Sequence, residues 1–167
     1  MKYSSAFLLI CLLFSDASCK KDSPVKSNNE FKATVSIAGN PEIIINATGG
    51  KYTMFSRYIR PNGDTFYSVV GGDDLHVVEI GLNKVSGTGT YKFSIDSATG
   101  FGSYCTYVFG NPLHPLEFYT TGTLDSTGAI TITNLTATHI EGSMTTATCR
   151  NDTGEVQVKN VTFKGDF

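Results

Sequence analysis

The stretch FKATVSI at residues 31–37 decides the fold of this chain, because apolar and polar side chains alternate along it. Phe31, Ala33, Val35 and Ile37 share one phase, and Lys32, Thr34 and Ser36 share the other. A period of two is typical of a strand with one face on a core and the other in water. The same alternation returns at Tyr91–Ile95 and in the last third of the chain. The sequence therefore predicts a sheet.

Turn signals divide the rest of the chain into short strands. Pro61-Asn62-Gly63-Asp64 is the strongest, because proline fixes one φ and Asn-Gly favours positive φ. No helical period stands out. We expect an all-β domain over residues 31–167: an antiparallel β-sandwich or partly closed β-barrel of about ten strands. The expected strands are 31–37, 43–45, 51–58, 65–70, 75–82, 91–95, 104–109, 116–121, 129–135, 139–148 and 155–167.

In the last expected strand, the apolar phase changes midway. Val156 and Val158 share one phase, whereas Val161 and Phe163 share the other. The change at Lys159-Asn160 predicts a β-bulge, which would curve the strand.

The first 18 residues have the pattern of an export signal. Lys2 precedes an apolar run at Ala6–Phe14, and small residues lead to Cys19. A run of this length is far short of the roughly 20 residues that span a bilayer. We expect residues 1–18 to be a lipoprotein signal peptide and Cys19 to carry lipid. Asp16 fits less well, and the alternative is an ordinary secretory signal that leaves Cys19 as a free or paired thiol.

Residues 19–30 follow as a polar segment, KKDSPVKSNNE after the cysteine, which we interpret as a lipidated N-terminus and flexible tether. Lipid on Cys19 would hold the domain at the membrane. We expect an outer membrane lipoprotein, on the periplasmic or the cell-surface face.

Bulk properties exclude some classes of partner. The net charge is −2, and nucleic-acid binding would need a basic face. Without the signal, about 150 residues remain, the size of one domain with its own core.

Two cysteines remain in the domain. Cys105 and Cys149 both lie in expected strands, and an exported protein meets an oxidising compartment. We expect a disulfide between them, closing a loop of about 45 residues and worth about 3–4 kcal/mol in the chain-entropy model. The alternative is two separate buried thiols.

The second half of the chain resembles a known family. The marks are Gly89-Thr90-Tyr91, Tyr119-Thr120-Thr121, residues 128–133 (GAITIT), residues 140–144 (IEGSM) and the closing residues 154–167. They are similar to a family of small Bacteroidota lipoproteins with a single β-domain and no assigned function. The resemblance implies fold and location only.

Candidate metal ligands are sparse. Asp73, Asp74, His76 and Glu79 form the densest set, but they lack the spacing of a calcium loop. We interpret them as a solvated turn beside a strand histidine. His114 and His139 have no partners at zinc-site spacing, so we expect ordinary loop and edge residues and no cofactor. No nucleophile motif is present, and we expect no enzyme.

Aromatic residues flank the proline-containing loop Asn111–Pro115. They are Tyr104, Tyr107, Phe109, Phe118 and Tyr119. Exposed strand aromatics can stack on sugars or peptides, but we expect at least half of these to fill the core. A binding face, if there is one, is expected beside this loop.

Two further positions concern modification. Ser97 and Ser126 follow aspartates in expected turns and fit a Bacteroidota O-glycosylation pattern, although plain Asp-Ser turn chemistry explains both equally well.

Taken together, the sequence favours a non-catalytic, lipid-anchored module that binds glycan or a partner protein at the cell envelope. A structural or assembly subunit of an envelope complex is the alternative, and a small enzyme ranks last.

Overall fold

The structure is a computed structural model that describes residues 28–95, 102–110, 117–121 and 127–167. The described residues form twelve strands: β1 (Glu30–Ile37), β2 (Ile43–Thr48), β3 (Thr53–Ile59), β4 (Thr65–Gly72), β5 (His76–Asn83), β6 (Gly89–Lys92), β7 (Ser94–Ile95), β8 (Gly102–Phe109), β9 (Glu117–Thr120), β10 (Ala129–Leu135), β11 (His139–Asn151) and β12 (Gly154–Asp166). In this part of the chain, no helix is long and apolar enough to cross a membrane.

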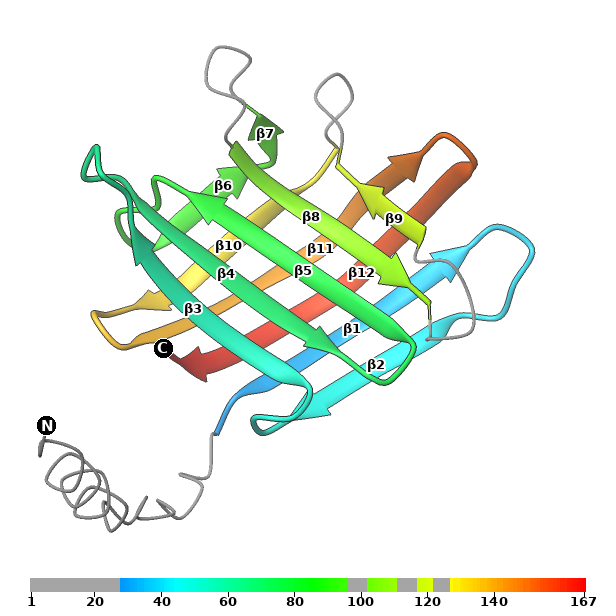
Figure 1. Cartoon of the computed structure of the whole chain (residues 1–167), viewed down its shortest axis with the longest axis horizontal. Helices are drawn as coiled ribbons and strands as arrows, with labels where there is room; N and C mark the ends of the chain where they lie inside the picture. Colours follow the sequence, from blue (N-terminus) through cyan, green and yellow to red (C-terminus); the bar gives the residue numbers. More distant parts are fainter. Residues whose placement is uncertain (1–27, 96–101, 111–116, 122–126) are drawn as a thin grey trace, which may run out of the picture.

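The strands form a nearly closed, barrel-like antiparallel sheet. The order of neighbours is β2-β1-β12-β11-β9-β8-β5-β4-β3, with β10 between β11 and β6, and β7 beside β8. Figure 1 shows two crossed layers. We call β3, β4, β5 and β8 the front layer, and β2, β1, β12, β11 and β10 the rear layer. The expected all-β, antiparallel fold is confirmed.

The core lies between the layers, because alternate residues of each strand point inward. In β1, Phe31, Ala33 and Val35 are buried, as the period of two predicts. The layers approach closely where Phe31 of β1 meets Gly71 of β4. A Cβ at Gly71 would lie 2.0 Å from the Phe31 ring, so only glycine fits at this contact.

The expected bulge in β12 is confirmed. Lys32 pairs with Thr162 but Thr34 pairs with Lys159, so two residues of β12 face one residue of β1. Asn160 takes a left-handed conformation there, with φ of 51°. The extra residue changes the phase, so that Val158 and Val161 both point into the core.

β2 and β4 both extend beyond their expected ends. β2 continues to Thr48, because Ala47 is buried against the core rather than turning the chain. β4 continues through Gly71-Gly72, although a glycine pair is typical of a turn and the expected strand ended at residue 70. The turn at residues 61–64 is present: Gly63 has φ of 85°, and its N–H donates to the Arg60 carbonyl at 2.9 Å.

Candidate functional site: the outer face of the front layer

The two layers present different outer faces. On the rear layer, Lys32 of β1 lies opposite Thr162 of β12, and Glu30 lies opposite Lys164, so the face that these two strands form is polar. On the front layer, the outward side chains are largely apolar or aromatic. They include Met54 and Tyr58 of β3, Phe66 and Val70 of β4, Val77 of β5 and Tyr104 of β8. This outer face is the candidate site.

Three rings form a row across the front layer, which we call the aromatic row: Tyr58, Phe66 and Tyr104. Ring centroids lie 6.4 Å apart for Tyr58 and Phe66, and 6.3 Å apart for Phe66 and Tyr104. The planes differ by only 36° and 30°. Tyr58 is 55% exposed, and the Arg60 guanidinium lies 5.0 Å from the Phe66 ring centroid. Tyr58 is therefore open to solvent, Phe66 and Tyr104 are partly exposed, and a cation lies over the Phe66 ring.

A carboxylate next to the row accepts two hydroxyl hydrogen bonds. Oε1 of Glu79 accepts from Tyr104 Oη at 2.9 Å and from Ser68 Oγ at 3.1 Å. Partial burial, and secondly the Glu79 carboxylate, raise the pKa of Tyr104 well above its usual value. Tyr104 therefore stays a neutral donor at physiological pH, and its ring is held in place.

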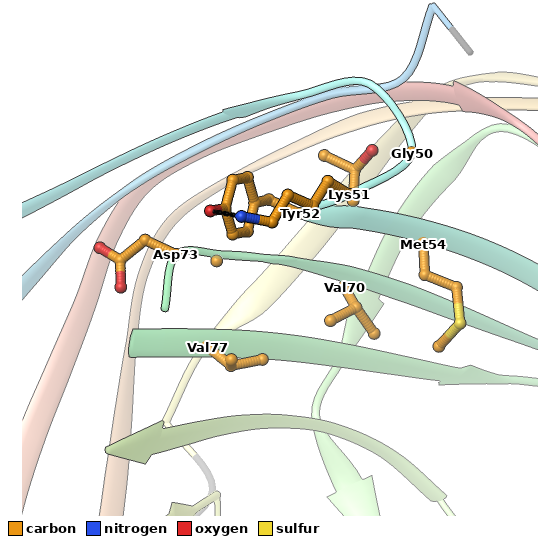
Figure 2. Close-up of a pocket in the computed structure, with 9 residues that line it drawn as sticks. Gly50, Lys51, Tyr52, Met54, Val70, Asp73 and Val77 are labelled. Carbon is orange, nitrogen blue, oxygen red and sulfur yellow. Dashed lines mark hydrogen bonds between the residues drawn. The ribbon is translucent and has the colours of Figure 1, made fainter. Parts of the chain in front are cut away.

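A shallow groove of about 310 Å³ lies on the same layer (Figure 2). Met54, Val70 and Val77 form its apolar floor. Lys51 and Tyr52 stand at its rim, where the Lys51 ammonium donates to the Tyr52 hydroxyl. Tyr52 in turn donates to Asp74 at 3.1 Å. The groove thus combines an apolar surface with polar groups at one end.

The aromatic residues named from the sequence divide between the two faces. Tyr107 and Tyr119 are buried, with ring centroids 6.0 Å apart. Tyr104 lies on the outer face, Phe118 is 56% exposed, and Phe109 is exposed at the end of β8. The expectation that at least half fill the core is therefore wrong, because strand phase sends neighbouring aromatics to opposite faces. Tyr58 and Phe66 were not singled out from the sequence.

The four residues considered as metal ligands do not come together. Asp73 accepts hydrogen bonds from the backbone N–H groups of Leu75 and His76 at 2.8 Å each, closing the β4–β5 turn. His76 and Glu79 point to opposite faces of β5: His76 Nδ1 lies 2.7 Å from the buried Tyr107 hydroxyl, whereas Glu79 faces outward. Among the described residues, no group of three or more His, Cys, Asp or Glu side chains is arranged so that it could hold a metal ion.

His139 has more partners than the sequence indicated. Its Nδ1 lies 2.5 Å from Asp166 Oδ1, and its Nε2 lies 2.9 Å from Glu141 Oε1. These hydrogen bonds, that with Asp166 first, raise the pKa of His139. The histidine is an ion-pair centre where β11 meets the end of β12, rather than an unpartnered edge residue. His114 lies outside the described residues.

The expected disulfide is not formed in the structure. Cys105 and Cys149 are both free thiols, fully buried in the core. They are neighbours all the same, since Cys149 Sγ donates to the Cys105 carbonyl at 3.4 Å. Cys19, Ser97, Ser126 and the loop at residues 111–115 lie outside the described residues, so their expected roles remain predictions.

Comparisons of the chain with protein-family models, with curated proteins and with solved structures give no match. The function is therefore inferred from the geometry of the outer face of the front layer.

Proposed function

We propose that this chain is a lipid-anchored protein of the cell envelope whose β-domain binds glycan, without catalysis, on the outer face of the front layer. The observation that supports this most directly is the aromatic row. Neighbouring rings on one outer face, with planes 36° and 30° apart, can receive the C–H faces of sugar rings. Adjacent rings about 6 Å apart provide a continuous apolar strip.

Polar groups beside the row support a sugar rather than a purely apolar ligand. A sugar carries hydroxyls around its apolar face, and these need hydrogen-bond partners at the edge of the rings. Glu79 and Arg60 lie beside the row and supply an acceptor and donors, and the buried Ser68 hydroxyl holds Glu79 in place. A partner protein is the second candidate, because the groove floor of Met54, Val70 and Val77 could receive an apolar side chain.

Glycan binding is tested with the full chain in detergent, by affinity electrophoresis through a panel of soluble polysaccharides. Tyr58→Ala is expected to weaken binding about tenfold, or about 1.4 kcal/mol. Ile59→Ala is the matched control, since Ile59 is 66% exposed on the same strand but lies outside the row. Retardation by no polysaccharide, or equal loss in both variants, would contradict the proposal. Melting temperatures of both variants check that the fold is intact.

The lipid anchor has its own test. Wild type is expected in the membrane fraction with the added mass of lipid, and Cys19→Ala in the supernatant. A soluble wild type of unmodified mass would contradict the lipid anchor, but it would not contradict glycan binding.

A further inference from the structure

One end of the sheet is an unpaired strand edge. β2 and β3 are the two ends of the strand order, and β2 pairs only with β1 in the described part of the chain. The Gly49 N–H donates to the Asn29 carbonyl at 2.9 Å, so every second residue of β2 counted back from Gly49 directs its backbone N–H and C=O toward β1. Antiparallel alternation then directs the backbone groups of Ile44, Asn46 and Thr48 away from β1.

The same three residues are accessible. Ile44 is 77% exposed, the most exposed large apolar side chain among the described residues, and Asn46 and Thr48 are exposed as well. Natural sheet edges are usually blunted by charge, proline or a bulge. The strand IIINAT has none of these between Ile43 and Thr48.

The other end of the sheet is different. β3 carries Arg57, an exposed charge of the kind that blunts a sheet edge, whereas β2 has no charged residue. Of the two end strands, β2 is therefore the one more suited to pair with a further strand.

We propose that β2 pairs in antiparallel fashion with β2 of a second copy, about a two-fold axis at Asn46. In this register Asn46 faces itself, and Ile44 of each copy faces Thr48 of the other. All three positions direct their N–H and C=O groups outward, so the register satisfies the edges of both copies at once. Such a contact is isologous, and it closes at two copies.

The sequence around β2 favours a second copy over an unrelated strand. Glu42 precedes the strand, is 56% exposed and lies 3.5 Å from Lys159 of its own chain, whereas Lys51 follows the strand, is 73% exposed and lies 3.7 Å from Asp74. Antiparallel pairing about Asn46 brings Glu42 of one copy to the turn that carries Lys51 of the other. Opposite charges therefore meet at both ends of the ladder, and the uncharged strand between them opposes no like charges.

Pairing at β2 does not depend on glycan binding, since β2 belongs to the rear layer and the aromatic row to the front layer (Figure 1). It would nevertheless place two aromatic rows on one assembly. Two linked sites on one polymer bind more tightly than either alone, because the second binding event is intramolecular.

Cysteine cross-linking of the full chain in intact cells tests the register. Asn46→Cys is expected to give a disulfide-linked dimer under mild oxidation. Thr34→Cys is the matched control, because Thr34 lies opposite Ile44 on β1, one strand inside the edge, and should stay uncrosslinked. Absence of a dimer with Asn46→Cys, equal cross-linking at both sites, or a cross-link to a different protein would overturn the proposal.

Sedimentation of the purified full chain in detergent tests the affinity. Asn46→Lys sets two ammonium groups opposite each other and is expected to raise the dimer dissociation constant at least tenfold. Thr34→Lys adds the same charge one strand away and is expected to leave the dimer in place. A monomeric wild type, or a dimer that Asn46→Lys does not weaken, would overturn the proposal. Circular dichroism of both variants checks the fold.

Discussion

The ring of Tyr104 lies directly over Gly81, its pairing partner on the neighbouring strand β5. A Cβ at Gly81 would lie 2.4 Å from the ring, closer than any real contact. The absence of a side chain on β5 therefore lets a β8 side chain lie down and complete the aromatic row. A small residue on β5 therefore fixes the position of a side chain on β8.

Gly81→Ala is expected to lift the Tyr104 ring and break its hydrogen bond with Glu79. We expect weaker glycan binding and a loss of about 1–2 kcal/mol in the free energy of unfolding. Urea denaturation and affinity electrophoresis measure the two effects. Gly87→Ala serves as the control, because a Cβ there meets nothing within 4 Å. If Gly81→Ala matches that control in both measurements, the ring does not depend on this glycine.

His139 gives the stability a pH dependence whose sign follows from its partners. Its folded-state pKa is raised, by hydrogen bonds with Asp166 first and Glu141 second. The stabilisation is therefore complete below the pKa of His139 in the unfolded state, about 6.5. It is lost as pH rises through the higher pKa of the folded state. The difference in unfolding free energy between wild type and His139→Gln should shrink with rising pH. Urea titrations at several pH values measure it, and a constant or growing difference would refute the assignment.

The buried thiols are expected to form a bridge under oxidation. The Cys149 side chain already reaches the Cys105 carbonyl, and the hydrogen bond with Cys149 and burial raise the pKa of Cys105. Little thiolate is present at neutral pH, so alkylation of the folded reduced chain should be slow. Mild oxidation should lower the mass by about 2 Da and raise the free energy of unfolding by about 3–4 kcal/mol. Cys149→Ser is the control, and an oxidised wild type with two alkylatable thiols after unfolding would contradict this expectation.

The bulge in β12 depends on a residue that tolerates positive φ. Asn160→Val should cost about 1–2 kcal/mol, because a β-branched side chain is strained at φ of 51°. Asn160→Gly should be close to neutral. Chemical denaturation of both variants measures the difference, and equal stability would show that the bulge relaxes to another conformation.

The periodicity of the sequence was sufficient to predict most of the strands. The range Ala129–Leu135 and the bulge at Lys159-Asn160 were predicted correctly, because local alternation reports which residues face the core. Gly71-Gly72 was predicted as a turn because glycine usually marks one. Its place inside β4 depends on the Phe31 ring, a contact between distant segments that no local pattern reveals.

The candidate site was harder to predict for the same reason. Tyr104 was singled out, but Tyr58 and Phe66 were not, although both are out of phase with the buried Phe55 and Tyr67. This alternation with buried residues could have predicted that Tyr58 and Phe66 point outward. Their meeting with Tyr104 required the strand order β3-β4-β5-β8, which only the folded sheet supplies.

The position of β1 has a mechanical consequence. β1 lies between β2 and β12, hydrogen-bonded along both edges, and Asn29 just before it holds the backbone N–H of Asp166 at 2.9 Å. A pull on the chain at Asn29, along the strand, would load both ladders in shear, so that many hydrogen bonds resist together instead of opening one by one. A domain held at this point would therefore withstand tension along β1 better than one held at the end of a peripheral strand.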